Sequence, residues 1–549
     1  MAFVNPLSAV RSGRVQLRLA FLAAGFSGAL LTTLCVLFDP RWETNDDVAM
    51  SMVAHGYGIA AVASPNLVFS NVIWGYLVRL LPSMGGVLGY SIATLLVLYV
   101  SSFSIFYFMG KLGIAPWTSF LIACAVLCRP ILFPQFTLNA GLLAGASMLA
   151  LMAYCETRSV LSMIAAAFLL TIAYLIRSQE VGLVLFVALP VMWSRRLHRD
   201  RFALRVGAIV LLVIAGAGIW DHFCYSGPAW RHFAALDASR APFTDFAIAQ
   251  KIADDPQILS HFRYSRNDVE LLGRFFFVDP KIFKPDTLRA MVSSVGTTHF
   301  FAGNANAAMD SIRSLLAPEI LPIVVLAAIT FVLAPSADLL GSWLLFLLAL
   351  VVMGLFGRGG LLRVDMPIVS LLCLLSIANV SGRSRVGLAK AISSRWRAER
   401  LIVACMAATA LGTSMYVLLP QARQASQHIA EVQAAAERFP SQIVVAWGAG
   451  LEFESLFPLL GDSAKLRSMK IFPLGVFTFA PFSVGAVQEA SGRGFVTRIR
   501  SADGLLMLAT PNVRLLDVWC RERFGGVLKG KILQAAPYVQ VDRYWCADR

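Results

Sequence analysis

The stretch that decides the fold is residues 19–47, LAFLAAGFSGALLTTLCVLFDPRWETNDD. An apolar segment over residues 19–38 is followed at once by a polar segment, residues 39–47, that ends in Asp46 and Asp47. Adjacent carboxylates repel each other, and two of them at a membrane surface suggest a site that handles protons, a cation or a hydroxyl. The stretch therefore predicts a membrane helix with a functional loop at its outer end.

The composition places the whole chain in a membrane. Hydrophobic residues make up 58% of it and charged residues only 14%, and the mean hydropathy is +0.69. The formal net charge of +15 does not indicate nucleic-acid binding, because much of it lies in short basic clusters between apolar segments, where the positive-inside rule expects it. The first apolar segment lacks a small-residue cleavage site and reads as a retained helix.

We predict a predominantly α-helical, polytopic membrane protein with about eleven spans. Basic residues set its orientation. Arg11, Arg14 and Arg18 before the first span predict a cytoplasmic N-terminus in the cytoplasmic (inner) membrane. Alternation from that start puts two further basic clusters on the same side, which supports the assignment: Arg195, Arg196, Arg199, Arg201 and Arg205, and Arg383, Arg385, Lys390, Arg395, Arg397 and Arg400. The predicted spans are residues 19–38, 86–109, 115–132, 138–155, 160–176, 180–194, 205–222, 317–334, 339–357, 361–380 and 401–420.

Three polar regions fall on the outer side: residues 39–85, residues 223–316 and the tail from 421. Residues 66–81 are apolar but short, and they predict a helix lying along the membrane interface, with Trp74 and Tyr76 at headgroup level. Residues 223–316 hold too many large apolar side chains for a solvated linker and predict several short helices. The transmembrane domain is thus expected over residues 1–420, with a separate outer domain over 421–549.

The tail has the pattern of a small α/β module. We predict a helix over residues 421–438, strands over 443–447, 505–508 and 538–541, and a helix over 512–524 that ends at Gly525 and Gly526. Of the nine cysteines, Cys520 and Cys546 share this tail. A disulfide between them and two free thiols are both compatible with the sequence, because spacing alone does not fix disulfide geometry.

The outward-facing charges gather at three places along the chain. Asp46 and Asp47 follow the first span, Arg177 and Glu180 lie at the turn before the sixth, and Arg358 and Arg363 lie at the turn before the tenth. Charges at membrane depth are costly and are usually paired or functional, and guanidinium groups bind phosphate bidentately. Two plainer interpretations remain: arginines that anchor helix ends, and carboxylates in the first turn of a short helix capped by Thr44 or Asn45.

With its Asn45-Asp46-Asp47 motif after the first span, the chain resembles the polytopic glycosyltransferases of the GT-C superfamily, which use polyprenyl-phosphate-linked sugars. The architectural resemblance covers residues 1–420 and the motif resemblance about residues 39–82. The chain departs from the best-known members in lacking an Asp-Glu-x-x-Tyr signature. The resemblance implies a sugar donor carried on polyprenyl phosphate, an envelope glycan, lipid or protein as acceptor, and action on the outer face of the bilayer.

The same resemblance implies roles for individual residues. Asp46 or Asp47 is expected to be the catalytic base, with the other carboxylate orienting the acceptor or holding a divalent cation, Mg²⁺ or Mn²⁺. Topology makes Arg177, Arg363 and Arg358 the candidates for the donor phosphate. The expected acceptor-binding residues are Glu43, Asn45 and Glu180. His55 is weighed as a metal ligand and as a structural histidine, and we assign no metal ligand.

Two other functions fit a polytopic chain with membrane-level charges. A transporter or flippase of lipid-linked sugars often has repeated halves and broken helices at matching positions, and no such repeat is visible here. A non-catalytic envelope assembly protein is the other alternative. Substituting Asp46 and Asp47 separates these classes, because an enzyme loses turnover while staying folded and a scaffold hardly responds.

Overall fold

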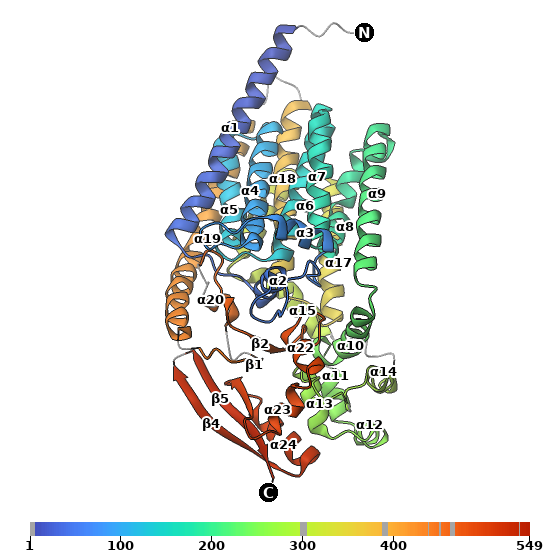
Figure 1. Cartoon of the computed structure of the whole chain (residues 1–549). Helices are drawn as coiled ribbons and strands as arrows, with labels where there is room; N and C mark the ends of the chain where they lie inside the picture. The colour runs from blue at the N-terminus through green and yellow to red at the C-terminus, as the bar shows by residue number, and fades with distance from the viewer. Residues whose placement is uncertain are drawn as a thin grey trace.

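The computed structural model describes residues 6–246, 248–280, 282–296, 305–386, 393–437, 439–448, 452–461, 467–536 and 538–548. A helical bundle forms one end of the molecule, with the N-terminal end of α1, and a small α/β module forms the other end (Figure 1). All eleven predicted spans are helical. The bundle consists of α1 (Pro6–Leu37), α4 (Gly89–Lys111), α5 (Pro116–Leu132), α6 (Phe136–Thr157), α7 (Val160–Ile176), α8 (Ser178–Ser194), α9 (Arg201–Cys224), α16 (Leu321–Leu333), α17 (Ala337–Leu355), α18 (Leu362–Val386) and α19 (Ser393–Ala436).

Helix length and apolarity confirm a multi-pass membrane protein. Within the described residues, seven helices are long and apolar enough to cross a membrane: α1, α4, α6, α9, α17, α18 and α19. Helix α16 and the preceding segment Ala305–Leu316 form a pair bent by 85°, and α5, α7 and α8 are shorter apolar helices. The predicted eleven spans therefore include four that are too short, or too bent, to qualify alone.

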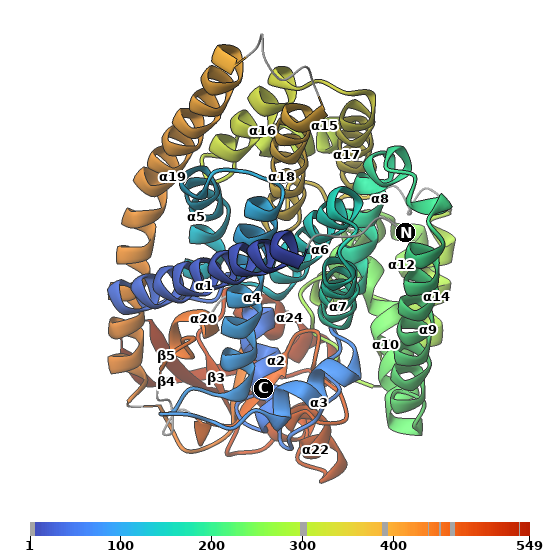
Figure 2. The same ribbon diagram turned by 90° about the horizontal axis from the view of Figure 1, so that it is seen from above.

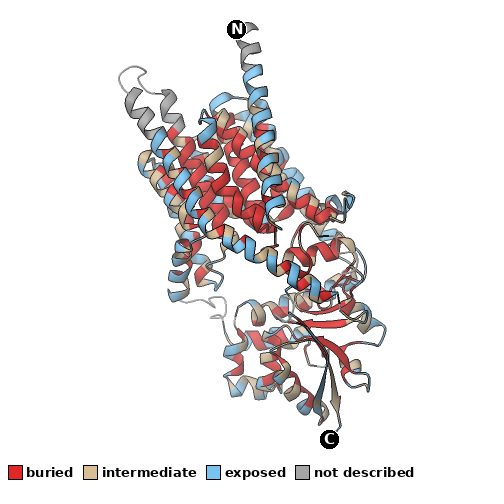
Figure 3. Cartoon of the chain, turned by 90° about the vertical axis from the view of Figure 1, so that its left-hand side faces the viewer, coloured by how far each residue is buried: buried red, intermediate tan, exposed pale blue. Residues whose placement is uncertain are grey.

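Burial separates central from peripheral helices. In the most apolar part of α6, 94% of the residues are buried, against 11% in α9, whose side chains such as Leu211 and Leu212 are exposed. Figure 3 shows the buried residues concentrated inside the bundle, and Figure 2 shows α9 and α19 at opposite margins. A helix that is apolar and exposed all round has lipid as its natural neighbour.

Ion pairs mark the end of the bundle that lies away from the α/β module. Arg195, after α8, pairs with Glu156, near the end of α6, at 2.5 Å. Asp200 caps α9 by accepting from the backbone N–H groups of Phe202 and Ala203, and the Tyr154 hydroxyl donates to it at 2.8 Å. The predicted basic cluster at 195–205 thus lies where three helix ends meet. The side chains of Arg11, Arg383, Arg385, Lys390, Arg395, Arg397 and Arg400 lie outside the described residues.

The first outer region forms two short helices, α2 (Asn45–His55) and α3 (Val72–Leu80). Helix α3 is shorter than the predicted residues 66–81 and lies across the end of the bundle that faces the α/β module (Figures 1 and 2). The Asn71 side chain caps it by accepting from the Ile73 N–H at 3.0 Å. Trp74 is only 8% exposed and packs against the protein, whereas Tyr76 points outward and is 44% exposed. The headgroup level of the two rings stays a prediction.

The second outer region is a set of short helices, as predicted. They are α10 (Pro228–Asp245), α11 (Ile248–Ala253), α12 (Pro256–Phe262), α13 (Arg266–Gly273), α14 (Pro285–Ser294) and α15 (Ala305–Arg313), followed by the 3₁₀ turn Ser314–Leu316. Phe276 from this region packs against Trp447, Phe495 and Trp519 of the tail, with ring centroids 5.3 Å apart in each pair. The second outer region and the tail therefore share one hydrophobic core.

The tail contains a five-stranded sheet in the order β2-β1-β3-β5-β4. Strands β2, β1 and β3 are parallel, with Val444 paired to Ile471 and Leu506, whereas β5 is antiparallel to both β3 and β4. The predicted strands correspond to β1, β3 and the start of β5, and β2 and β4 were not predicted. The strands are β1 (Val444–Trp447), β2 (Ile471–Leu474), β3 (Leu505–Leu508), β4 (Val527–Ala536) and β5 (Val539–Ala547), and the helices are α20 (Phe453–Leu456), α22 (Val484–Ala490), α23 (Phe495–Ile499) and α24 (Val513–Phe524).

A disulfide joins two elements of the tail, and helix α19 joins the tail to the bundle. Cys520 of α24 and Cys546 of β5 form a disulfide, with their Cα atoms 5.9 Å apart, which decides the alternative left open by the sequence. Helix α24 ends at Gly525 in the left-handed conformation, as its sequence predicts. Helix α19 runs without interruption through residue 420, the predicted domain boundary, and carries the chain from the bundle into the outer layer.

Candidate active site

The polar segment after α1 is held against the loop between α5 and α6. The backbone N–H of Arg41 donates to the Leu132 carbonyl at 3.1 Å, and that of Glu43 donates to the Pro134 carbonyl at 3.0 Å. These two bonds fix the path of the chain up to the start of α2, where Asp46 and Asp47 occupy the first turn. The helix-dipole interpretation of the acidic pair is therefore correct for its position, and the surroundings of the two carboxylates decide what else they do.

Asp47 is a fixed, buried carboxylate. Its side chain is inaccessible to solvent, and Oδ1 accepts from the Tyr90 hydroxyl at 3.0 Å and from the Phe136 N–H at 3.1 Å. Burial raises the pKa of Asp47 well above its ordinary value, while these two hydrogen bonds work in the opposite direction. Asp47 thus ties α2 to α4 and to the start of α6, and no face of it is free for a substrate.

Asp46 is the accessible member of the pair. Its side chain is 27% exposed, and Oδ2 lies 3.6 Å from Nη1 of Arg363. Desolvation raises the pKa of Asp46, and the positive charges of Arg363 and Arg177 oppose that rise. A partly desolvated carboxylate is a stronger base than a solvated one, so Asp46 has both the access and the basicity that proton abstraction requires.

Arg177 is held in place at the turn between α7 and α8. Its Nη1 donates to the Phe69 carbonyl at 3.0 Å, and its guanidinium lies over the ring of Phe136 at 5.3 Å. It interacts electrostatically with Asp46 and with Arg363. A guanidinium with a fixed stem and partly uncommitted N–H donors is suited to binding an anion bidentately.

Arg358 extends the positive charge toward the second outer region. It pairs with Asp245, at the end of α10, at 2.8 Å and lies over the Phe246 ring at 4.9 Å. It is about half exposed, more than Arg363. Arg363 and Arg177, predicted from two different turns of the chain, thus act on one accessible carboxylate, and Arg358 lies beyond them, interacting with Arg177.

Two of the residues expected to bind the acceptor make contacts within the protein. Glu180 is 3% exposed and lies inside the bundle against Gly141 and Pro367, where a substrate has no access to it. Glu43 forms a two-oxygen ion pair with Arg129, at 2.8 and 2.9 Å from its Nη2. Asn45, at the start of α2, is exposed beside Asp46.

His55 is structural. Its Nε2 accepts from the Tyr90 N–H at 3.1 Å, which caps the first turn of α4. Burial, together with the charges of Arg79 and Arg467, lowers the pKa of His55 to about 4, so the ring is neutral at physiological pH. Across the described parts of the chain, no group of three or more His, Cys, Asp or Glu side chains is arranged to hold a metal ion.

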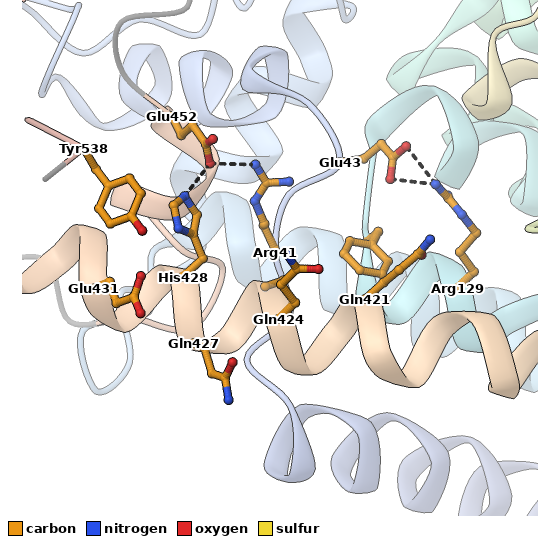
Figure 4. Close-up of a pocket in the computed structure, with 12 residues that line it drawn as sticks. Arg41, Glu43, Arg129, Gln421, Gln424, Gln427, His428, Glu431, Glu452 and Tyr538 are labelled. Carbon is orange, nitrogen blue, oxygen red and sulfur yellow. Dashed lines mark hydrogen bonds and ion pairs between the residues drawn. The ribbon is translucent and has the colours of Figure 1, made fainter.

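A polar cavity of about 640 Å³ lies between α19, the polar segment after α1 and the tail (Figure 4). The Glu43–Arg129 pair forms one part of its wall, and Glu452 accepts from Arg41 at 3.3 Å and contacts His428 at 2.8 Å in another. Sequence reasoning missed Arg129, His428, Glu452 and Tyr538. Only Arg129 carried a signal, as a charge inside an apolar helix. The cavity is lined by Arg41, Glu43, Arg129, Phe133, Gln421, Gln424, Ala425, Gln427, His428, Glu431, Glu452 and Tyr538.

Solved structures resemble this chain, whereas sequence comparisons find no match. No protein-family model matches the chain, and no curated protein matches it. The crystal structure of ArnT from Cupriavidus metallidurans bound to undecaprenyl phosphate aligns with 94% of this chain and 97% of that chain, at 12% sequence identity and a TM-score of 0.35. A likeness at that level transfers no residue role and no activity, so what this site does has to be argued from its own geometry.

Proposed function

We propose that this protein is a membrane glycosyltransferase that moves a sugar from a polyprenyl-phosphate donor to an acceptor hydroxyl. The observation that carries the proposal is the pairing of Asp46, a partly exposed carboxylate, with Arg363 at 3.6 Å and with Arg177 and Arg358 nearby, at the outer end of a membrane bundle. A carboxylate beside several cations is what sugar transfer from a lipid phosphate requires: a base for the acceptor and positive charge for the leaving group.

The acceptor oxygen forms a bond to the anomeric carbon of the donor sugar, and the bond from that carbon to the phosphate oxygen breaks. The electron pair leaves with the polyprenyl phosphate, whose negative charge Arg177 and Arg363 stabilise. The acceptor proton passes to Asp46. Since charge develops on the phosphate as the bond breaks, cations already in place lower the barrier without reorganising.

Asp47 is proposed as a positioning residue. Its bonds to Tyr90 and Phe136 fix the first turn of α2 and thereby the direction of the neighbouring Asp46 side chain. Asp47 also interacts electrostatically with Asp46. The division of labour proposed here assigns proton transfer to Asp46 and geometry to Asp47.

The proposed location is the outer face of the cytoplasmic membrane. The basic residues near the N-terminus and around residues 195–205 predict that their end of the bundle is cytoplasmic. Asp46, the arginines and the tail then lie outside. The Cys520–Cys546 disulfide favours the same side, because disulfides persist in oxidising compartments.

The experiment that tests the function is glycan analysis of envelope material from cells lacking this protein, complemented with wild type, Asp46→Asn or Asp39→Asn at matched expression. Asp39 is an exposed carboxylate of the same segment and serves as the control. We expect a sugar to disappear in the absence of the protein and to return with wild type and Asp39→Asn only. Full restoration by Asp46→Asn would reject the proposed base and favour a carrier or scaffold.

A further inference from the structure

The cavity at α19 differs from the arginine cluster in the charge it offers. Its lining holds two arginines, Arg41 and Arg129, and three glutamates. Arg129 is already neutralised by Glu43, and Arg41 is neutralised by Glu452. Glu431 is left, hydrogen-bonded to the Tyr538 hydroxyl. With three glutamates against two arginines, the lining carries an excess of negative charge, which disfavours a phosphate.

The remaining surface of the cavity suits hydroxyl groups. Three glutamine amides, Gln421, Gln424 and Gln427, line it from one face of α19 and offer both donors and acceptors. Its volume of about 640 Å³ falls within the usual range for small-molecule sites, roughly 300–1,000 Å³. A polar lining of this size fits a short saccharide better than an apolar ligand.

Tyr538 supplies an aromatic wall. It lies between β4 and β5 with a φ of 67°, a left-handed conformation that a tyrosine rarely adopts, and its ring meets that of His428 edge-on at 4.7 Å. The side chain is 53% exposed. Left-handed backbone at a bulky residue is tolerated where the placement of the side chain matters, and an exposed aromatic face is a surface on which a sugar ring can stack.

The cavity is close enough to Asp46 to share one substrate with it. Glu43, in the cavity wall, precedes Asp46 by three residues, which span at most about 10 Å of extended chain. Asp46 also interacts electrostatically with Glu454, two residues from Glu452 of the wall. A chain of a few sugars held in the cavity therefore reaches the proposed base.

We propose that this cavity binds the acceptor and that the acceptor is a neutral, hydroxyl-rich oligosaccharide without phosphate at the bound sugars. This inference rests on the proposed function, because only a transferase has an acceptor. The donor phosphate then binds on the arginine side of Asp46 and the acceptor glycan on the α19 side.

The test measures binding separately from turnover. Full-length protein in nanodiscs is titrated with neutral oligosaccharides released from envelope glycan of cells lacking the protein, and binding is followed by saturation-transfer NMR. We expect wild type and Asp46→Asn to bind equally and Tyr538→Ala to bind about tenfold more weakly, as for loss of a central aromatic contact. Gln424→Ala provides a second lining variant on a continuous helix, and Gln433→Ala, half-buried on α19 outside the lining, is the control.

The outcomes separate the two proposals. Unchanged binding in both Tyr538→Ala and Gln424→Ala, or displacement of the oligosaccharide by inorganic phosphate, overturns the cavity proposal while leaving the glycan result untouched. If cells lacking the protein keep all their sugars while binding remains intact and dependent on Tyr538, the transferase proposal is overturned and the protein is a saccharide-binding membrane protein. Weaker binding in both lining variants with normal binding in Gln433→Ala supports the proposal.

Discussion

At the scale of single residues, two adjacent carboxylates have opposite surroundings. Asp46 is partly exposed and faces Arg363, whereas Asp47 is fully buried and accepts two hydrogen bonds. The sequence motif identified the pair but not its division, because Tyr90 and Phe136 approach Asp47 from positions 43 and 89 residues away. Which of two neighbouring side chains in a helical turn is exposed depends on contacts with residues that are distant in the sequence.

Replacing each carboxylate by its amide should separate the two roles. We expect Asp46→Asn to lower kcat by about 10²- to 10⁴-fold, the usual contribution of a positioned base, without changing the free energy of unfolding much. Asp47→Asn retains an oxygen that accepts from Tyr90 and Phe136 and should keep most of the activity. Steady-state turnover and thermal unfolding of the purified variants check this, and equal losses of turnover in both would contradict the assignment.

Removing the acceptor atoms of Asp47 should affect stability instead. Asp47→Leu leaves the Tyr90 hydroxyl and the Phe136 N–H buried without a partner, which costs about 1–3 kcal/mol for each such group. We expect a lower midpoint of unfolding in detergent than for Asp47→Asn. A midpoint equal to that of the wild type would show that these bonds contribute nothing net.

The pH dependence of turnover should report Asp46. Because desolvation raises the pKa of this carboxyl, and the base must be ionised, kcat/KM should rise with pH through an apparent pKa above the ordinary aspartate value of 3.8. Arg363 lowers the pKa of Asp46, so Arg363→Gln should move that limb to higher pH. If the apparent pKa of kcat/KM is the same in Arg363→Gln as in the wild type, the titrating group is not influenced by Arg363.

At the scale of elements, α3 is held at its N-terminal end by its own cap, Asn71, and by contacts with α9. Asn71 accepts from Ile73 and donates to the Ala217 carbonyl at 3.1 Å, and Asp221 accepts from the Val72 N–H at 2.7 Å. The apolar pattern predicted the helix but not which face would be buried, because the partner, α9, lies about 145 residues later in the chain. The bonds to α9 thus fix the N-terminal end of α3 against the bundle.

Loss of the α3 cap should be measurable. Asn71→Ala removes a side-chain cap and should destabilise the protein by about 1 kcal/mol, with a further loss from the bond to α9. Thr409→Ala is the control, because this exposed residue of α19 caps no helix and its hydroxyl donates to the Cys405 carbonyl of the same helix. Equal unfolding midpoints for the two variants would contradict the role given to Asn71.

At the scale of the whole molecule, the sequence predicted what depends on local pattern and missed what depends on distant contacts. Apolar runs identified all eleven bundle helices. Strand β2 escaped because Pro473 stands in a four-residue strand, and β4 escaped because Lys529, Gly530 and Lys531 interrupt its apolar pattern. The cavity could not be predicted from local sequence patterns, because Arg41 and Glu452 of its wall are 411 residues apart.

The disulfide should matter for the outer module. It closes a segment with a sequence separation of 26, for which chain entropy predicts a stabilisation of about 3 kcal/mol. We expect Cys520→Ser to unfold the tail at lower temperature while the bundle helices persist, as followed by limited proteolysis with mass mapping. Cys405→Ser, at an exposed free cysteine of α19, is the control. An unaltered cleavage pattern in Cys520→Ser would show that the tail does not depend on this bond.

The continuity of α19 has a consequence for substrate selection. At 1.5 Å per residue its 44 residues extend about 66 Å, more than twice the hydrocarbon thickness, so one helix with Pro420 in its interior is long enough both to cross the bilayer and to carry Gln421, Gln424 and Gln427 of the cavity wall. The height of that wall above the lipid is therefore set by helix geometry. We therefore expect the proposed transferase to discriminate between identical sugars by their distance from the membrane.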